Sequence, residues 1–494
     1  MLRRKSLYGI LVLGIFIVIG SLYFFTDNQP NTSEKNMSVN KEVGSDNNTV
    51  GENEDNNSKE VNHENIIKEI INISEEVNAD NMYETVTYLA EQPRAAGTEG
   101  EKRAVDYIES QFKSLGYETT IQEFPIEYYK EIRKAITIND KPLEGDIRTL
   151  FGSNVSGKVK GELVHVGKAT VSEVGEEVKG KIALIENSAR PYYEKISNVM
   201  NKGAIGAIMY NDQPNGSFNG MVKDGNDIPI ITISRDQGQK LVDQVEKGTV
   251  IASLDVEVEK VTTPSYNVIA TMKPDNSNNT GQIVTVGAHH DSVPGGPGAN
   301  DDASGVSAVL ELARIFSQKS IDTELRFITF GAEEKGLIGS TYYVNNLPSE
   351  EKSKIIAHFQ MDMVGAAAAG GQNPAGGLIM FTPDGRKNLV TDLGAAASKN
   401  IFSEAIPYGE LGRSDHQPFH DVGIPAALFI HAPLEPDYHQ PTDTIDKISK
   451  EKLQQVAEII GSAVLTIASP ETPAIAEDKA VPALVEYEYE NRAL

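Results

Sequence analysis

The chain contains no cysteine, and its 45 basic residues are too few to balance 71 acidic ones. Without cysteine there can be no disulfide, no thiolate metal ligand, no cysteine nucleophile and no lipoprotein anchor. Histidine and carboxylate side chains are the strong metal ligands that remain, and they suit zinc or a similar first-row metal. The net charge of −26 argues against nucleic acid as a partner, because its phosphates would be repelled.

Small residues are scarce near the N-terminus, where the first alanine is Ala79. Basic residues at 3–5 precede an apolar run over 7–25, which as a helix would be about 28 Å long and could cross a bilayer. Because basic flanks stay inside, we expect the bulk of the chain to be exported. The lack of a small-residue cleavage site favours an uncleaved signal anchor over 1–25, with a cleaved signal peptide as the alternative. The chain would then lie on the extracellular side of the cell membrane, or be secreted.

Polar segments flank the expected globular part of the chain. Residues 26–64 are rich in Asn, Asp, Glu and Ser, with almost no large apolar side chains, so we expect a disordered stalk. Apolar residues at helical spacing predict one helix over about 66–77 and another over about 100–115, both in the first part of a catalytic domain at 65–144. The tail, 471–494, is acidic and expected to be mobile.

Short β-rich runs, with helical patterns between them, occupy the region from 145 to 260, where no cluster of His, Asp and Glu occurs. We expect an inserted β-rich domain that interrupts the catalytic domain. The main catalytic part is expected at 261–470, where apolar strands alternate with helices. This pattern indicates an α/β fold with a mixed, largely parallel central sheet flanked by helices, and ligand sites at the carboxyl ends of the strands.

The first candidate ligand, His289, directly follows the apolar run IVTVGA. Successive strand residues point to opposite faces, so His289 and His290 cannot both face one site. We choose His289 because Asp291, two positions on, could accept the other ring N–H and fix the tautomer. A Gly/Pro loop then leads to Asp301, which we expect to be a carboxylate that bridges two cations. Ser304 is the expected N-cap of the helix that follows.

Acidic residues also end the next two predicted strands. Adjacent glutamates usually face solvent, but Glu333 and Glu334 interrupt an apolar run at the carboxyl edge of the sheet. Strand alternation gives them different roles, one toward a metal and the other toward a bound water. Asp362 follows the run IIAHFQM in the same way, and His439 lies beside Tyr438 in a Pro-rich loop. Two zinc ions would nearly balance three such carboxylates in charge.

The segments GAHxDS, NDDASG, AEExGLxGS and YHxPxDT together resemble metallopeptidase family twenty-eight, the co-catalytic dizinc aminopeptidases, over about residues 80–470. The insert is similar to the protease-associated domain in its segments GKIALIE, NKGAIGAIMYND and IPIITIS. The resemblance implies a zinc exopeptidase fold with two zinc ions. It assigns His289 and Asp362 to one zinc, Glu334 and His439 to the other, and Asp301 to the bridge.

The resemblance also implies that Glu333 is the general base, that Tyr438 contacts the intermediate, and that Arg413 in GRSDHQPF steadies the substrate. We therefore expect an exported zinc-dependent aminopeptidase that removes N-terminal residues from peptides with a free N-terminus, by metal-activated water. The alternative is another zinc exopeptidase of the same clan, such as a carboxypeptidase. A non-catalytic receptor-like ectodomain is less consistent with the sequence, because such a protein should have lost its ligands.

Overall fold

The computed structural model describes residues 70–152, 155–188, 190–212, 216–218, 220–222, 227–274, 279–369, 377–470 and 485–490. The expected signal anchor (1–25) and polar stalk (26–64) lie outside the described residues. No helix within the described ranges is long and apolar enough to cross a membrane.

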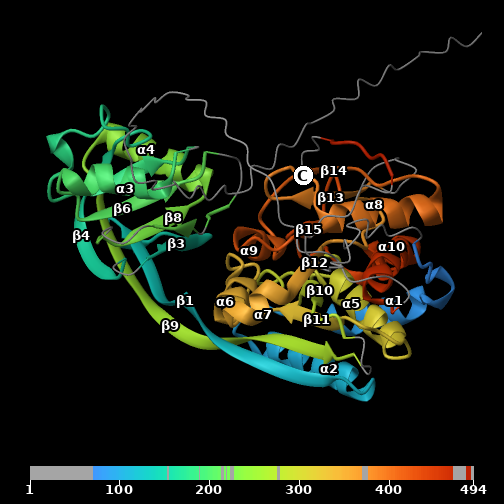
Figure 1. The fold of residues 1–494 in the computed structure, drawn as a ribbon. Coiled ribbons are helices and arrows are strands. Elements are labelled where there is room, and N and C mark those ends of the chain that lie inside the picture. Colours follow the sequence, from blue (N-terminus) through green and yellow to red (C-terminus); the bar gives the residue numbers. More distant parts are fainter. Residues whose placement is uncertain are drawn as a thin grey trace, which may run out of the picture. The chain divides into compact units, whose positions relative to one another are not determined.

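Four parallel strands form the centre of the peptidase sheet, in the order β15-β12-β10-β11 (Figure 1). Each is fully or almost fully buried, because each consists of a nearly continuous apolar run. Their carboxyl ends meet at one edge of the sheet. The bounds are Ile283–His289 for β10, Glu324–Phe330 for β11, Ile355–Met361 for β12 and Ala426–His431 for β15.

Antiparallel pairings flank this parallel centre on both sides. On one side β13 (Leu378–Thr382) is antiparallel to β15 and parallel to β14 (Tyr408–Glu410). On the other side β11 is antiparallel to β9 (Ile251–Met272), which pairs with β1 (Glu118–Ile138). The predicted fold class, a mixed and largely parallel sheet flanked by helices, is confirmed.

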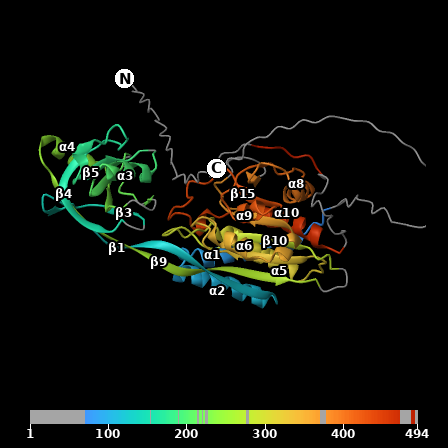
Figure 2. The ribbon, with the colours of Figure 1, turned by 60° about the vertical axis from the view of Figure 1, so that its left-hand side comes forward.

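Helices cover both faces of the peptidase sheet (Figure 2). Alternation along β10 explains this: Val284 and Val286 join the large core with α1, α2, α5, α8 and α10, whereas Ile283 joins a separate core beside α6 and α9. The bounds are Ala79–Leu89 for α1, Glu99–Ser114 for α2, Ala303–Phe316 for α5, Ile338–Asn346 for α6, Ser349–Lys354 for α7, Leu389–Phe402 for α8, His416–Asp421 for α9 and Lys450–Ala468 for α10.

The inserted region contains a second parallel sheet, in the order β4-β5-β6-β8. It has its own apolar cores on its two faces, with α3 and α4 packed there. The short strand β3 extends the sheet antiparallel to β8, and β7 pairs with β3. The bounds are Ile147–Phe151 for β3, Gly157–His165 for β4, Ile182–Glu186 for β5, Tyr192–Asn201 for α3, Gly206–Tyr210 for β6, Gly220–Met221 for β7, Ile230–Ile233 for β8 and Arg235–Lys247 for α4.

Two long strands, β1 and β9, belong to both sheets, and the sequence pattern did not predict either of them. They pair antiparallel from Glu118↔Thr271 to Ile138↔Ala252, with a register shift between Glu131 and Arg133. The expected domain boundary at 260 falls inside β9, whereas β1 ends seven residues before the boundary expected at 145. Those boundaries stay a prediction, since the polypeptide passes between the two regions inside continuous strands.

The helix predicted over 66–77 is wrong for the part that the structure describes. From residue 70 the chain forms only a short 3-10 helix, η1 (Ser74–Glu76). The main-chain N–H of Ile73 instead donates to Ser462 Oγ of α10 at 3.2 Å. Helix α1 begins after Asn78, whose side chain caps its first turn. Tertiary hydrogen bonds to α10 thus replace the local helix that the apolar spacing suggested.

The acidic tail, expected to be mobile, is docked in part. Residues 485–490 exchange main-chain hydrogen bonds of 2.8 and 3.0 Å with Tyr408 of β14. The Tyr487 hydroxyl donates to Asp392 Oδ1 at 2.6 Å, and Lys387 Nζ lies 3.8 Å from the centre of its ring. The expectation of mobility was wrong for this segment because it rested on the acidic composition of the tail and gave no weight to two aromatic side chains within it. The remainder of the tail lies outside the described residues.

Candidate metal centre

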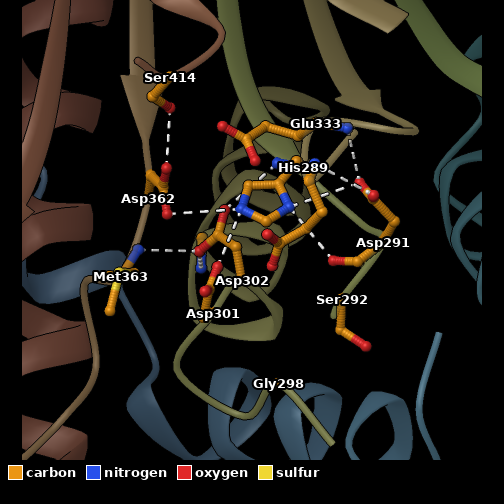
Figure 3. Close-up of polar contacts among 12 residues, drawn as sticks. His289, Asp291, Ser292, Gly298, Asp301, Asp302, Glu333, Asp362, Met363 and Ser414 are labelled. Atoms are coloured by element: carbon orange, nitrogen blue, oxygen red, sulfur yellow. Dashed lines mark hydrogen bonds and ion pairs between the residues drawn. The ribbon is translucent and has the colours of Figure 1, made fainter. Parts of the chain in front are cut away.

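The five predicted metal ligands come together at the carboxyl edge of the peptidase sheet. Figure 3 shows three of them, His289, Asp301 and Asp362. Each of them lies at or just after a strand end, or at the start of a helix, because parallel strands bring their carboxyl ends to one edge. They are His289 at the end of β10, Asp301 before α5, Glu334 after β11, Asp362 after β12 and His439 after β15.

Asp301 lies between the two histidines. Its Oδ1 is 3.1 Å from His289 Nε2, and its Oδ2 is 3.2 Å from His439 Nε2. Asp362 Oδ1 approaches His289 Nε2 at 3.5 Å, and Glu334 Oε2 approaches His439 Nε2 at 3.1 Å. Each imidazole therefore has one carboxylate of its own and shares the third. This geometry suits two neighbouring cations with Asp301 as the bridge, as the sequence predicted.

Three of these carboxylate oxygens are buried without a hydrogen-bond partner among the described residues: Asp301 Oδ2, Glu334 Oε1 and Asp362 Oδ1. Burying a carboxylate oxygen without a partner is costly, so such atoms are retained where a cation holds them. Two imidazoles and three carboxylates are also the ligand types that zinc takes in the absence of thiolates. The donor set therefore fits a pair of zinc ions.

The titration of the cluster reflects an excess of negative charge. Burial lowers the pKa of both histidines, but the carboxylates outweigh it: Asp362 and Glu333 raise the pKa of His289 well above its usual range, and Asp301 and Glu334 raise that of His439 to about 10. Burial, followed by the charge of Asp301, raises the pKa of Glu334 to about 7. A site that holds protons this tightly attracts cations, and metal binding there would release protons.

Asp302 also lies near His289 and Asp362 and is of a ligand type. Its carboxylate is already occupied, because it accepts the main-chain N–H groups of His289 at 3.2 Å, Gly305 at 2.8 Å and Met363 at 3.1 Å. Asp302 thus caps α5 and ties the ends of β10 and β12 to it. The prediction of Ser304 as this cap is wrong, since the Ser304 hydroxyl donates to the main-chain carbonyl of Asn300 instead.

Asp291 orients His289 through a different atom from the one expected. Its main-chain carbonyl oxygen is 3.2 Å from His289 Nδ1, whereas its carboxylate is 3.6 Å away. The carboxylate is engaged elsewhere, because it accepts the N–H of Glu333 at 3.0 Å and that of Glu334 at 3.3 Å. Asp291 therefore fixes both the imidazole and the backbone of the glutamate pair.

The Glu333 carboxylate, the expected general base, has no hydrogen-bond partner among the described residues. Its side chain lies close to His289 in Figure 3. Burial raises the pKa of this carboxyl group well above its usual range, His289 opposes the rise, and Asp415 and Asp362 add to it. A carboxylate with raised pKa and no fixed donor is suited to accept and return a proton.

Comparisons with known proteins agree with this geometry. The profile of Peptidase family M28 matches residues 267–464, and that of the PA domain matches residues 159–241. Aminopeptidase YwaD of Bacillus subtilis is 36% identical over 411 residues, covering 78% of this chain and 84% of the relative. The chain belongs to peptidase family M28. The family, the enzyme class and the PA insert predicted from the sequence are confirmed.

Two solved structures resemble this M28 peptidase along most of its length. An aminopeptidase from Aneurinibacillus sp. strain AM-1 is 46% identical, with a TM-score of 0.69, and covers 85% of this chain and 99% of its own. A structure described as that of BSAP, a zinc aminopeptidase from Bacillus subtilis, is 32% identical, with a TM-score of 0.68, and covers 83% and 99%. The likeness includes the insert as well as the peptidase sheet.

The two residues of the M28 peptidase that were predicted to contact substrate, Tyr438 and Arg413, differ in their surroundings. The Tyr438 ring stacks on His439, with 3.8 Å between ring centres, and 37% of this tyrosine is exposed. Arg413 is exposed at a backbone φ of 70° and has no hydrogen bond or ion pair with another described residue. Tyr438 thus borders the metal centre directly. The role of Arg413 stays a prediction.

Sequence reasoning missed several residues that hold the ligand loops in place. Asp443 accepts the N–H groups of Asn300 at 2.8 Å and Asp301 at 3.0 Å. Ser414 donates to Asp362 Oδ2 at 2.8 Å, which leaves only Oδ1 for His289. The signal available was spacing: Asp443 lies four residues after His439, and Ser414 directly follows Arg413.

Proposed function

We propose that the chain is an exported zinc aminopeptidase with two zinc ions and Glu333 as general base. The observation that carries the proposal is the position of Asp301, which presents one oxygen to each of the two histidines. A single-metal site would need no shared carboxylate. His289 and Asp362 would hold one zinc, Glu334 and His439 the other, and Asp301 both. The relatives' names support peptidase chemistry at a free N-terminus.

The zinc pair, when bound, supplies Lewis acidity toward the scissile carbonyl and makes a water molecule more acidic. Glu333 would take the proton of the attacking water, because it is not one of the five assigned ligands and its carboxylate accepts no hydrogen bond from another described residue. It then delivers this proton to the leaving amine. Asp291 keeps Glu333 in place through the main-chain N–H.

The carboxylates of the centre also account for a preference for N-termini. Glu333, together with the acidic residues of the cluster, would accept a free α-amino group, whereas an acylated N-terminus brings no positive charge. Tyr438 lies where it would contact the reacting carbonyl, and Arg413 would steady the substrate from the exposed rim. A carboxypeptidase of the same clan is the alternative activity, and a non-catalytic ectodomain would not retain this donor set.

The same proposal includes export. The basic and apolar N-terminal segment at 1–25 would anchor the chain with its peptidase region outside the cell, or direct its secretion. The anchor is the expected membrane contact, and peptides with free N-termini are the expected partners. Fractionation of cells that express the full chain tests this: we expect activity with the membrane fraction, released from it when the first 25 residues are removed.

The decisive experiment compares leucine-type aminoacyl anilides with their N-acetylated forms, with and without a chelator. We expect cleavage of the free forms only, loss of activity in chelator, and recovery on addition of zinc. Elemental analysis should find about two zinc ions per chain. Cleavage at the C-terminus of N-acetylated peptides would establish the carboxypeptidase instead. One metal per chain after zinc reconstitution would exclude the dizinc assignment.

Glu334→Gln is the matched variant for the ligand set. Because Glu334 contacts His439 and not His289 among the described residues, its loss should weaken one metal site and leave the other occupied. A variant that still binds two zinc ions with the affinity of the parent protein would contradict this assignment.

A further inference from the structure

Arg94 is a fully buried arginine that none of the metal motifs includes. It lies between α1 and α2, and its guanidinium donates to main-chain carbonyls rather than to a carboxylate. Nε donates to His290 O at 2.8 Å, Nη2 to Gly298 O at 2.9 Å, and Nη1 to Pro297 O. Its own main-chain N–H donates to Ser292 Oγ at 2.9 Å. One side chain thus holds both ends of the loop at 290–298.

This loop joins two of the metal ligands, since His289 precedes it and Asp301 follows it. Packing at its second end is tight: a Cβ atom at Gly298, where φ is 61°, would lie 2.2 Å from Asp301 O and 3.0 Å from Arg94 Nη2. The Ser292 hydroxyl closes the loop internally by donating to Gly296 O at 2.9 Å. The position of Asp301 relative to His289 therefore depends on the contacts of Arg94.

The positive charge of Arg94 lies close to several carboxylates around the same loop. Three carboxylates beside it accept main-chain N–H groups of the ligand segments: Asp291, Asp302 and Asp443. Burial lowers the pKa of Arg94 to about 10, and Asp302, Asp291 and Asp443 oppose the fall, so it is charged at neutral pH. Among the described residues the buried lysines and arginines are Arg94 and Lys195, and Lys195 belongs to the insert.

We propose that Arg94 is a positioning residue of the metal centre, which sets the spacing of His289 and Asp301 and balances the carboxylates that hold the ligand backbones. The inference rests on the proposed function, because it concerns the affinity of the same two zinc ions. Groups that orient metal ligands typically change metal affinity by about 10- to 100-fold when they are removed. A purely structural arginine would instead change stability and leave metal affinity unchanged.

Two substitutions separate geometry from charge. Arg94→Lys keeps the charge but cannot form the forked set of bonds to the loop carbonyls. Arg94→Met removes both. We expect the zinc affinity, measured by competition with a chelator of known affinity, to fall about tenfold in Arg94→Lys and further in Arg94→Met. The d–d absorption spectrum of the cobalt-substituted protein should also change, because the spacing of the ligands changes.

Arg103→Lys is the matched control. Arg103 also donates to main-chain carbonyls near the end of α1, namely Tyr88 O and Leu89 O, and Arg94 shares the second of these at 3.2 Å. Arg103 does not contact the loop at 290–298. The control should therefore lose stability in a similar way but keep the zinc affinity and the cobalt spectrum of the parent protein.

The outcomes separate this inference from the proposed function. Parent protein that binds fewer than two zinc ions contradicts the function, whatever the Arg94 variants do. Parent protein that binds two, together with Arg94→Lys of unchanged affinity and spectrum, overturns the inference alone. If neither Arg94 variant folds, Ser292→Ala decides, because it removes only the hydroxyl between Arg94 and Gly296. We expect its zinc affinity to fall about threefold or more, and an unchanged affinity would count against the role of Arg94.

Discussion

Two parallel sheets in this protein each bring a histidine and an acidic residue together at their carboxyl edge. In the insert, His165, Glu186 and Tyr210 are the last residues of β4, β5 and β6. In the peptidase sheet, His289 ends β10 and Asp362 directly follows β12. The backbone topology of the two edges is alike, but only the second has the properties of a metal centre.

The difference lies in how the polar atoms are paired. In the insert the Tyr210 hydroxyl lies between the other two groups, 3.2 Å from His165 Nε2 and 3.4 Å from Glu186 Oε2. His289 Nε2 and Asp362 Oδ1 instead approach each other directly at 3.5 Å, and this oxygen is buried without a hydrogen-bond partner among the described residues. A parallel sheet brings side chains together at its carboxyl edge. They form a candidate metal site where their polar atoms lack hydrogen-bond partners within the protein.

The two histidines titrate in opposite directions for the same reason. Burial lowers the pKa of His165, and the charges of Glu186, Glu246 and Glu173 only partly oppose it. Burial also acts on His289, but several carboxylates outweigh it and raise its pKa well above the usual range. Among the described residues, carboxylates that contact the ring of His289 directly, rather than burial, therefore distinguish the two edges.

The strongest test of this comparison changes one glutamate in each region. Glu333→Gln should keep the metals and lower kcat by at least about 10²-fold, because a general base is lost. Glu186→Gln, its counterpart in the insert, should leave kcat unchanged, since an amide still accepts from Tyr210. Steady-state kinetics on a leucine anilide, with metal analysis, measure both. Similar kcat values for the two variants would remove the functional distinction between the edges.

Removal of the metal should change hydrogen exchange in the peptidase sheet and leave it unchanged in the insert. Zinc at about 100 times its dissociation constant stabilises a single site by about 2.7 kcal/mol, because it binds only the folded state. We expect zinc to slow hydrogen exchange in β10 and β12, whose ends carry ligands, and to leave exchange in β5 and β6 unchanged. Mass spectrometry with and without a chelator reports this. Equal protection of both sheets would show that the metal acts on the whole fold.

The next prediction concerns the insert, where a buried lysine should make the unfolding free energy depend on pH. Burial lowers the pKa of Lys195 to about 8, below the value of an unfolded lysine near 10.4. The unfolded chain then binds more protons between these values, so stability rises as pH increases from about 8 to about 10.4 and is lost as pH falls through 8. Relative to Lys195→Met, the parent protein should gain about 2 kcal/mol over this window. Urea unfolding of both proteins measures it, and parallel curves would contradict it.

The smallest expected effect concerns the hydroxyl that closes the insert edge. Tyr210→Phe removes the hydrogen bonds to His165 and Glu186 and should cost about 1 kcal/mol of unfolding free energy. Zinc content and kcat should not change, because no metal ligand is touched. Thermal unfolding and the anilide assay test the two halves of this statement. A gain of metal binding in the insert would mean that the hydroxyl alone separates the two edges.

Local pattern was sufficient for most of the peptidase sheet. The strand predicted from the run IIAHFQM is β12 without change, and the helix predicted over about 100–115 is α2, shifted by one residue. Continuous apolar runs and helical spacing fix such elements, since each is decided within a short window. The helix predicted at 66–77 failed because its main-chain donors bond to α10, far away in the sequence.

By itself the sequence determined the ligand types, their order along the chain and their place at strand ends, because cysteine is absent and parallel strands align their carboxyl ends. The sequence favoured Asp301 over its neighbour Asp302, but only the tertiary structure shows why: Asp302 accepts main-chain N–H groups, whereas Asp301 faces both histidines. Only the tertiary structure brought Arg94 to the carbonyl of His290, 196 residues away, and Asp443 to the main-chain N–H of Asp301, 142 residues away. Periodicity reports what lies within a few residues along the chain, and these contacts depend on chain folding that brings distant groups within hydrogen-bond distance.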